Sequence, residues 1–480
     1  MITDCYISKL TLALVVFMFF LCSCMSFVFH ESIFVSVLSS FLSSTVVFFV
    51  IFGSLRKGDF NVFALFALSI TFGYLISYLG TVVINMTSLI SYNISEINEI
   101  GIDKLNYSLS IIHIVICILV VLSFFFGNVD GEYYQVCQSE IVGDVVYKTM
   151  ALAIILFVTF FWGIKLADLE NTGQVAEQNF FKIISFNLTL VFFQVSLISV
   201  LSFSTLSKYN KFISLLLFVT TIFLVVFSGR RYVLYSLLLA VISIGLNGNI
   251  RKKVKPIHLI FGVFVLFISQ YIFISLRFYL WQSSINDVDV FDLFLSVFDV
   301  LMNQTDDVSQ YLSQNYSSRG MVINFFAELI DVLDSNVLLF SKGTILFSSI
   351  IVSIPKVLLP IDKEPFLSLA YEEHVAAMLQ GRTDYEDLAN TLLTAGFVDF
   401  SYFGVILYPV FFSFLYIFIL RVGKGFLSLV NMYILFSYII FSVLYFEKGL
   451  AGYFTSIIIA FVTIAIFSTA KAFLYSARQE

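Results

Sequence analysis

Charged side chains are scarce in this sequence. Asp, Glu, Lys and Arg make up 12% of its 480 residues, whereas 60% of the residues are hydrophobic. Soluble globular domains carry roughly 25% charged residues, so this chain cannot cover its apolar content with a water-facing surface. The composition excludes a soluble enzyme, a disordered tail, a fibrous repeat and a nucleic-acid-binding protein. It requires a lipid bilayer as solvent.

Proline and cysteine are also rare, with five residues of each, and the 23 glycines leave little room for linker or collagen-like segments. None of the cysteines forms a C-x-x-C pair, and most lie in apolar runs. This pattern predicts small buried hydrophobes and neither a disulfide framework nor a zinc site. The cysteines are Cys5, Cys22, Cys24, Cys117 and Cys137.

The common catalytic and nucleotide-binding motifs are missing from the sequence. It contains no Walker loop, no G-x-S-x-G, no H-E-x-x-H and no dinucleotide fingerprint. Asp287 and Asp289 form a D-x-D, but a three-letter acidic match is common by chance. The sequence therefore predicts no cofactor and no metal site.

What the sequence has in abundance is long apolar runs of about 17–25 residues, the length that crosses a bilayer as a helix. Strict alternation is absent, so helices are predicted and a membrane barrel is not. The expected fold is all-α: a polytopic integral membrane protein with about 12 transmembrane helices. The runs are 10–29, 33–53, 62–84, 109–127, 149–166, 183–205, 212–228, 232–248, 257–275, 403–420, 426–446 and 450–470.

Basic residues in the short connections predict the orientation. Arg56 and Lys57, the basic cluster at 251–255, and the pair Arg421 and Lys424 all fall at even-numbered connections. Cytoplasmic loops carry an excess of Lys and Arg, so both termini are expected in the cytoplasm. The loop expected at 128–148 fits poorly, because it is acidic.

One connection is far longer than the others and divides the chain into three regions. Residues 1–275 hold spans one to nine, residues 276–402 form an extracytoplasmic cap loop, and residues 403–480 hold spans ten to twelve with a cytoplasmic C-terminus. A loop of this length is too long for a plain connector. Periodicity predicts amphipathic helices at 291–303, 321–334 and 366–380 within a folded, largely helical cap. The apolar stretch 336–354 is predicted as a re-entrant or interfacial segment, or as an additional span.

Arginines at the outer ends of two spans are the strongest candidates for an anion site. Arg230 and Arg231 follow Ser228 and Gly229 in a tight turn, and Arg277 directly follows span nine. Guanidinium groups present a planar fork of donors that suits phosphate oxygens. These arginines are therefore predicted to bind a pyrophosphate. The alternative is that they anchor the helix ends at the lipid headgroups.

The cap contains candidates for acid–base chemistry and for glycan binding. His374, with Glu373 and Glu372 beside it, is predicted to act as a general base. Arg319, Arg382 and Asp384 are candidates for glycan binding. The alternative for each is a solvated loop charge.

Taken together, these features resemble the Wzy-type oligosaccharide repeat-unit polymerases. The resemblance rests on twelve spans with both termini inside, the turn at 228–231 and the large outer loop. The stretch 390–400 with Gly404 is similar to the segment that leads these proteins into a late span. The related O-antigen ligases share outer arginines and a loop histidine, and Arg230, Arg231, Arg277 and His374 stand at comparable places.

This resemblance implies an enzyme of the bacterial inner membrane that makes O-antigen or a related surface polysaccharide in lipopolysaccharide biosynthesis. Such a metal-independent glycosyltransferase moves a glycan from undecaprenyl pyrophosphate onto the non-reducing end of the next lipid-linked repeat unit. The pyrophosphate is the leaving group, so no cofactor is needed. A chain-length regulator protein is an expected partner.

Two other functions remain open from the sequence. An O-antigen ligase would transfer the same kind of glycan to lipid A core, and no motif separates it from a polymerase. A lipid-linked oligosaccharide flippase or transporter would place charges inside its spans and have short loops. Lys165 is the one clear Lys or Arg within a predicted span, and no internal repeat is obvious.

Overall fold

Most of the chain is placed in a computed structural model. It describes residues 2–57, 60–86, 101–126, 128–129, 131–162, 180–228, 230–247, 321–334, 340–356, 358–372, 374–376, 390–446 and 448–476. Within these ranges the regular structure is helical except for one short antiparallel pair, β1 (Phe60–Asn61) with β2 (Asn128–Val129). The chain divides into two compact units. Unit 1 comprises Met1–Val129, Ser313–Ile419 and Ser442–Ile458, and unit 2 comprises the remainder.

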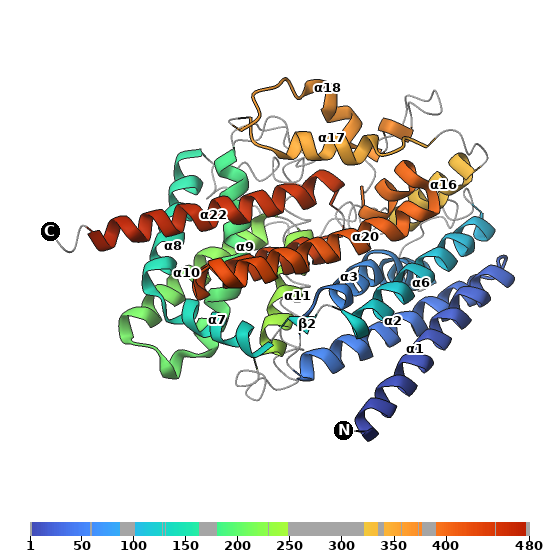
Figure 1. Ribbon diagram of the computed structural model, residues 1–480, viewed down its shortest axis with the longest axis horizontal. Coiled ribbons are helices and arrows are strands. Elements are labelled where there is room, and N and C mark those ends of the chain that lie inside the picture. Colours follow the sequence, from blue (N-terminus) through green and yellow to red (C-terminus); the bar gives the residue numbers. More distant parts are fainter. Residues whose placement is uncertain are drawn as a thin grey trace, which may run out of the picture. The chain divides into compact units, whose positions relative to one another are not determined.

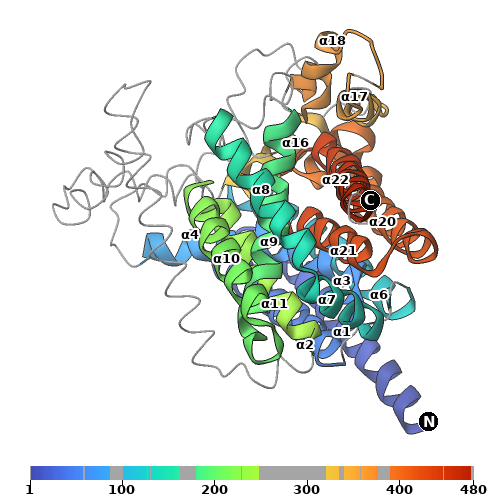
Figure 2. The ribbon, with the colours of Figure 1, turned by 90° about the vertical axis from the view of Figure 1, so that its left-hand side faces the viewer.

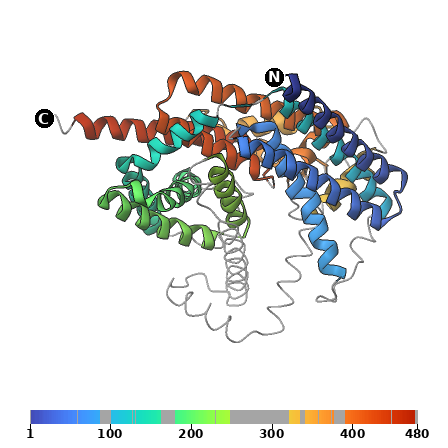
Figure 3. The same cartoon turned by 90° about the horizontal axis from the view of Figure 1, so that it is seen from below.

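Unit 1 begins with helices that pack lengthwise. α1 (Ile2–Val28) lies against α2 (Ile33–Lys57) and α6 (Ile102–Phe125), as Figures 1 and 3 show. Their outer faces expose large apolar side chains, while the contacts between them are lined by serines. Ser26 hydrogen-bonds Ser39 at 2.9 Å, and Ser43 hydrogen-bonds His113 at 2.9 Å. Apolar outer faces with small polar residues between helices are typical of a membrane bundle.

The third predicted span is a helix with a π-helical centre. It consists of α3 (Val62–Ile70), the π-helix η1 (Thr71–Ile76) and α4 (Ser77–Met86). Asn61 caps α3 by accepting a hydrogen bond from the backbone N–H of Ala64 at 3.1 Å. π-Helical turns inside α-helices are rare and occur often at functional sites. This one therefore directs attention to what packs against it.

The cap region of unit 1 contains α16 (Met321–Asp334), α17 (Thr344–Ser353), α18 (Glu364–Leu367) and the 3₁₀ turn η6 (Ser368–Ala370). α17 and α18 lie together (Figure 1). The helix predicted at 321–334 is confirmed as α16. The one predicted at 366–380 is instead short pieces in its described part, and the one at 291–303 lies outside the described residues.

The apolar stretch 336–354 forms a helix that is too short to be an additional span. Its described part turns at Lys342 (φ 53°) and Gly343 (φ 96°) and then forms α17, which has 10 residues. Ten helical residues rise about 15 Å, half of the ~30 Å of a hydrocarbon core. α17 cannot cross a membrane by itself, and of the two predicted readings the re-entrant or interfacial one fits its length.

The long helix α20 (Leu392–Phe426) is broken near its start. Phe400 and Ser401 leave helical geometry, and Ser401 has a positive φ of 57°. Across this break Gly396 and Gly404 meet backbone to backbone. A Cβ atom built on Gly396 would lie 2.3 Å from the carbonyl oxygen of Gly404. Only glycine fits such an approach, so the chain folds sharply before the predicted span at 403–420 begins.

Unit 2 contains α7 (Gly131–Gly143), α8 (Val145–Trp162), α9 (Phe180–Leu201), the turn η3 (Phe203–Thr205), α10 (Lys208–Ser228) and α11 (Arg230–Leu246). α8, α9 and α10 pack against one another (Figure 2). The connection expected at 128–148 is largely helical in its described part. Residues 131–143 form a helix that meets α8 at a bend of 70°. Lys148 consequently lies inside α8.

The last helices are α21 (Leu429–Leu444) and α22 (Leu450–Ser476). Among the described residues, seven helices are long and apolar enough to cross a membrane, or eight if the bent pair α7–α8 counts as one span. The chain is a multi-pass, helical membrane protein. The predicted runs that fall on described residues all lie on helices, the run 257–275 lies outside them, and the count of twelve and the orientation stay predictions.

Candidate functional site

The predicted site residues are only partly within the described chain. α10 ends at Ser228 and α11 begins at Arg230, so the predicted turn is present, but the side chains of Arg230 and Arg231 are outside the described part. His374 is exposed, and its ring lies edge-on to that of Tyr371 at 6.1 Å. The residues that lie outside the described ranges are Arg277, Arg319, Glu373, Arg382 and Asp384.

The residue beside this predicted base, Glu372, is buried. Its side chain is 0% exposed, and its Oε1 accepts hydrogen bonds from the backbone N–H of Thr391 at 2.7 Å and from Thr394 Oγ1 at 2.6 Å. Buried carboxylates are rare unless hydrogen bonds hold them. These two donors therefore fix one oxygen of the carboxylate in a single orientation.

The donors come from the start of α20. Thr391 directly precedes the helix, and its Oγ1 accepts a hydrogen bond from the backbone N–H of Thr394 at 3.1 Å. This is the side-chain cap that Ser and Thr make at helix N-termini. The positive end of the helix dipole favours a carboxylate at the same point. Glu372 thus lies where the first turn of α20 stabilises a negative charge.

The π-helix of the third span supplies the next member of the site. The hydroxyl of Tyr74, which is 1% exposed, hydrogen-bonds Thr391 Oγ1 at 2.6 Å. Its neighbour Gly73 makes room for the ring of Phe446, since a Cβ built on Gly73 would lie 2.2 Å from that ring. The π-helix therefore places the Tyr74 hydroxyl at Thr391 and, through Gly73, packs closely against Phe446.

A lysine forms the other side of the site. Lys448, in the connection between α21 and α22, donates hydrogen bonds from Nζ to Ser442 Oγ at 3.3 Å and to Ser456 Oγ, and Nζ lies 5.5 Å from the ring centroid of Tyr453. Gly452 leaves room for its stem, because a Cβ there would lie 2.4 Å from Lys448 Cγ. A Cβ on Gly449 would lie 3.6 Å from Cβ of Asn390, the residue before Thr391. The lysine connection and the Glu372 cluster are neighbours.

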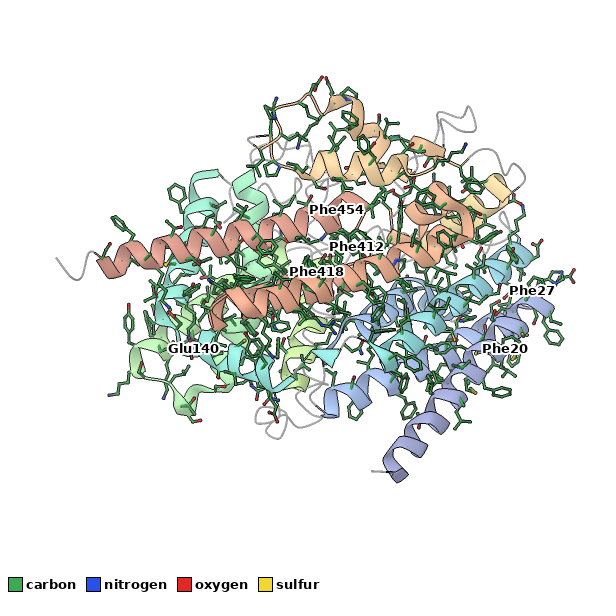
Figure 4. The ribbon with its side chains drawn as sticks, in the orientation of Figure 1. Phe20, Phe27, Glu140, Phe412, Phe418 and Phe454 are labelled. Atoms are coloured by element: carbon green, nitrogen blue, oxygen red, sulfur yellow. The ribbon has the colours of Figure 1, made fainter. Side chains whose placement is uncertain are left out.

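Aromatic rings enclose the lysine side. Tyr453 packs against Phe412 at 5.1 Å between ring centroids and against Phe66 at 6.1 Å. Phe412 and Phe454, labelled in Figure 4, are likewise 5.1 Å apart. These rings remove water from the surroundings of the ammonium group, and burial lowers the pKa of Lys448 to about 7.

Lys448 has neutral partners within the described part of the chain. No carboxylate there lies within ion-pair distance of its Nζ. It also precedes α22, whose N-terminal end carries the positive pole of the helix dipole. A cation that aromatic rings partly shield from water, beside a positive helix end, is unfavourable unless an anion is present. The arrangement is thus suited to bind a negatively charged group.

Asp399, at the break in α20, joins that helix to α17 of the cap. Its buried carboxylate accepts hydrogen bonds from the backbone N–H groups of Ile345 at 3.1 Å and Leu346 at 3.0 Å, and from the hydroxyls of Ser341 and Tyr408. The two carboxylate oxygens therefore accept hydrogen bonds from backbone N–H groups in the first turn of α17. We assign Asp399 to structure, because its carboxylate is saturated by donors.

Sequence reasoning singled out Glu372 only as a neighbour of His374, and it missed Lys448 and Tyr74. A signal for Lys448 exists: it is a base in the short connection at 447–449, which the predicted topology places outside. Tyr74 has no such signal, because a tyrosine in an apolar run gives no indication of a π-helix.

Comparison of the chain with known proteins gave no match to a protein-family model, to a curated protein or to a solved structure. Within the described ranges, no three His, Cys, Asp or Glu side chains gather as a metal site would require. The functional assignment therefore depends on the chemistry of the site and on the sequence resemblance.

Proposed function

We propose that this chain is a membrane glycosyltransferase that polymerises undecaprenyl-pyrophosphate-linked repeat units into O-antigen or a related surface polysaccharide, as Wzy-type polymerases do. The observation that carries the proposal is the buried carboxylate of Glu372. It comes from the segment before the late spans and is held by the first turn of α20 beside the phenol of Tyr74. The groups that hold Glu372 belong to segment 390–400, which is part of the sequence resemblance.

The reaction needs a base and a stabilised leaving group. The acceptor hydroxyl attacks the anomeric carbon of the donor glycan, and a carboxylate takes its proton. The bond from that carbon to the pyrophosphate oxygen breaks, and its electron pair leaves with the pyrophosphate. We assign the base to Glu372 in place of His374 and Glu373, because Glu372 is buried and oriented. Arg230, Arg231 and Arg277 remain the proposed holders of the leaving pyrophosphate.

The test is Glu372→Gln, which keeps the size of the side chain and removes the base. Purified full-length protein is given lipid-linked repeat units, and polymer length is followed on gels. We expect polymerisation to fall about 10²- to 10⁴-fold, the usual contribution of a general base. Glu364→Gln is the matched control, since Glu364 is an exposed carboxylate in the same cap. Normal polymer from a well-expressed Glu372→Gln variant would contradict the assignment.

Deletion of the gene separates a polymerase from a ligase. A strain without the polymerase keeps single repeat units on lipid A core and loses the ladder of longer chains. A strain without the ligase loses both. We expect the first pattern, and the second would favour an O-antigen ligase.

A flippase or transporter is the second candidate, and one observation favours it. Lys148 lies inside α8 and is fully buried, whereas charges in membrane helices often mark transport pathways. Reconstitution into vesicles with fluorescent lipid-linked glycan distinguishes the two functions. A transporter would move the lipid between leaflets without lengthening the glycan, and a polymerase would lengthen it.

A further inference from the structure

The Lys448 side of the site suggests a ligand that the arginines do not account for. The proposed reaction uses two lipid-linked substrates, a donor and an acceptor, and each carries its own pyrophosphate. The predicted arginine cluster accounts for the leaving pyrophosphate alone. A second cationic site would therefore serve to bind the pyrophosphate of the acceptor.

We propose that Lys448 binds a phosphate or pyrophosphate group at the N-terminal end of α22, with Ser442 and Ser456 as its hydroxyl neighbours. The inference rests on the proposed function for the identity of the ligand. The ammonium group carries three donors, and the hydroxyls that occupy it are neutral. An arriving oxyanion replaces neutral acceptors with a charged one and gains the helix dipole as well.

Two features make the site reachable and shaped for a ligand. Lys448 is partly exposed, unlike Glu372 and Tyr74, so its connection is not sealed within the protein. Gly449 and Gly452 flank it, and the missing side chain at Gly452 leaves space that the stem of the lysine fills. The backbone therefore carries no side chain at these two positions, and the ring centroid of Tyr453, also at the start of α22, lies 5.5 Å from the ammonium nitrogen.

A purely structural cation would behave differently from a ligand-binding one. If Lys448 holds the fold together, replacing it with the similarly shaped Met lowers stability. If it is kept for an anion, Lys448→Met removes a charge that aromatic rings partly shield from water, so the ligand-free protein melts at the same temperature or higher. The two roles predict opposite shifts in one measurement.

The experiment measures thermal unfolding of the full chain in detergent, with inorganic pyrophosphate, farnesyl pyrophosphate or uncharged farnesol added. We expect both pyrophosphates to stabilise the wild-type protein and farnesol to have no effect. Stronger stabilisation by farnesyl pyrophosphate identifies a lipid-borne group, and equal stabilisation identifies the free anion. Lys448→Met is expected to weaken binding about 10- to 100-fold, the usual loss for a charged hydrogen bond.

Lys356→Met is the matched control, because Lys356 is an exposed lysine of the cap, and its pyrophosphate affinity should be unchanged. Gly452→Ala is a second variant that keeps the charge but displaces the stem of Lys448, and it should weaken binding about threefold or more. Unchanged affinity in Lys448→Met overturns the proposal, as does an equal loss in Lys356→Met. Failure of Lys448→Met to fold would also overturn it, since the lysine would then be structural.

These outcomes are independent of polymerisation. If the wild-type protein binds pyrophosphate through Lys448 but makes no polymer, the anion site is supported and the proposed function fails. If it makes polymer but Lys448→Met binds pyrophosphate as the wild type does, the proposed function is retained and the anion site is wrong.

Discussion

Each unit holds a lysine whose ammonium group donates to neutral oxygens, and the two lysines are surrounded in different ways: Lys148 is fully buried, whereas Lys448 is partly exposed. In unit 2, Nζ of Lys148 donates to the carbonyl oxygen of Val142 at 2.5 Å, to Asn210 Oδ1 at 2.5 Å, and to Ser214 Oγ at 3.0 Å. In unit 1, Lys448 has two serine hydroxyls and an aromatic ring. The Lys148 ammonium donates to a backbone carbonyl and a side-chain amide oxygen, which are strong acceptors. The Lys448 ammonium donates to hydroxyl groups, which are weaker ones.

This difference in hydrogen-bond partners distinguishes a lysine that stabilises the fold from a lysine that binds a ligand. Lys148 uses all three of its donors, and it ties α8 to the end of α7 and to α10. Asp144 at the same bend caps α8 through the backbone N–H of Val146 at 3.0 Å and pairs with Lys471 at 2.5 Å. Among the described residues, the hydrogen-bond partners of Lys448 are hydroxyl groups and not carbonyl groups. We therefore read Lys148 as a brace at the bend, which weakens the case for a transporter.

The largest expected effect that tests this comparison is the loss of the Lys148 brace. Lys148→Met removes the charged donor of the Val142 carbonyl and of the Asn210 amide oxygen and leaves these buried oxygens with hydrogen bonds of 3.5 Å, so we expect stability to fall by about 3 kcal/mol. Thermal unfolding of the purified protein measures it. Lys208→Met, at an exposed lysine of α10, should change stability by less than about 0.5 kcal/mol. A Lys148→Met variant as stable as the wild type would erase the distinction between the two lysines.

The pH dependence of stability gives the next largest effect. Burial lowers the pKa of Lys448 from its ordinary value of 10.5 to about 7. Between these values the unfolded chain holds a proton that the folded protein has released, so stability rises with pH. We expect the wild type to gain about 2 kcal/mol relative to Lys448→Met between pH 7 and pH 9. Parallel pH profiles of the two proteins would show that the ammonium is not buried in solution.

A smaller effect is expected from Asp144→Asn. The amide still caps α8, but the ion pair with Lys471, whose two side chains are 27% and 15% exposed, is lost. We expect stability to fall by about 1 kcal/mol and the loss to shrink in high salt. Glu140→Gln is the control, since Glu140 is an exposed carboxylate of α7, labelled in Figure 4. An equal loss in both variants would mean that Asp144 contributes no specific contact at the bend.

The smallest effect compares one hydroxyl partner from each lysine. Ser214→Ala removes one of the oxygen partners of Lys148, and Ser456→Ala removes one of the hydroxyls beside Lys448. We expect a loss of about 1 kcal/mol in the first and less in the second, because the Lys448 ammonium reaches solvent or an anion more easily. Urea unfolding with both variants measures the difference. A larger loss in Ser456→Ala would reverse the comparison and point to a structural Lys448.

Much of the helical architecture was predictable from apolar runs and periodicity. The amphipathic pattern at 321–334 gave the bounds of α16, because one face of that helix is buried and the pattern records it. The bend before α8 was not predictable. Asp144 and Lys148 interrupt the apolar pattern and are typical of a loop. In the structure Asp144 caps α8 and pairs with the distant Lys471, and Lys148 lies within α8 and donates to the distant Asn210.

The sequence predicted the segment that contributes to the candidate site, but it did not predict which residue of that segment is buried there. Glu372, Glu373 and His374 are equivalent as sequence, since all three are polar residues in one short segment. Folding against Thr391 and Thr394 buries Glu372 and leaves His374 exposed. Which of two nearby residues turns inward depends on the contacts that distant segments make with them, and composition does not encode that detail.

By itself the sequence determined that this protein folds in a membrane as helices, since its apolar runs leave backbone groups no other way to be satisfied in hydrocarbon. The tertiary structure alone decided which polar groups lie buried together. Glu372, Tyr74 and Lys448 are far apart in sequence, and contacts among helices bring them to the start of α20 and α22. Burial and hydrogen bonding between distant segments, and not local pattern, give these three residues their chemistry.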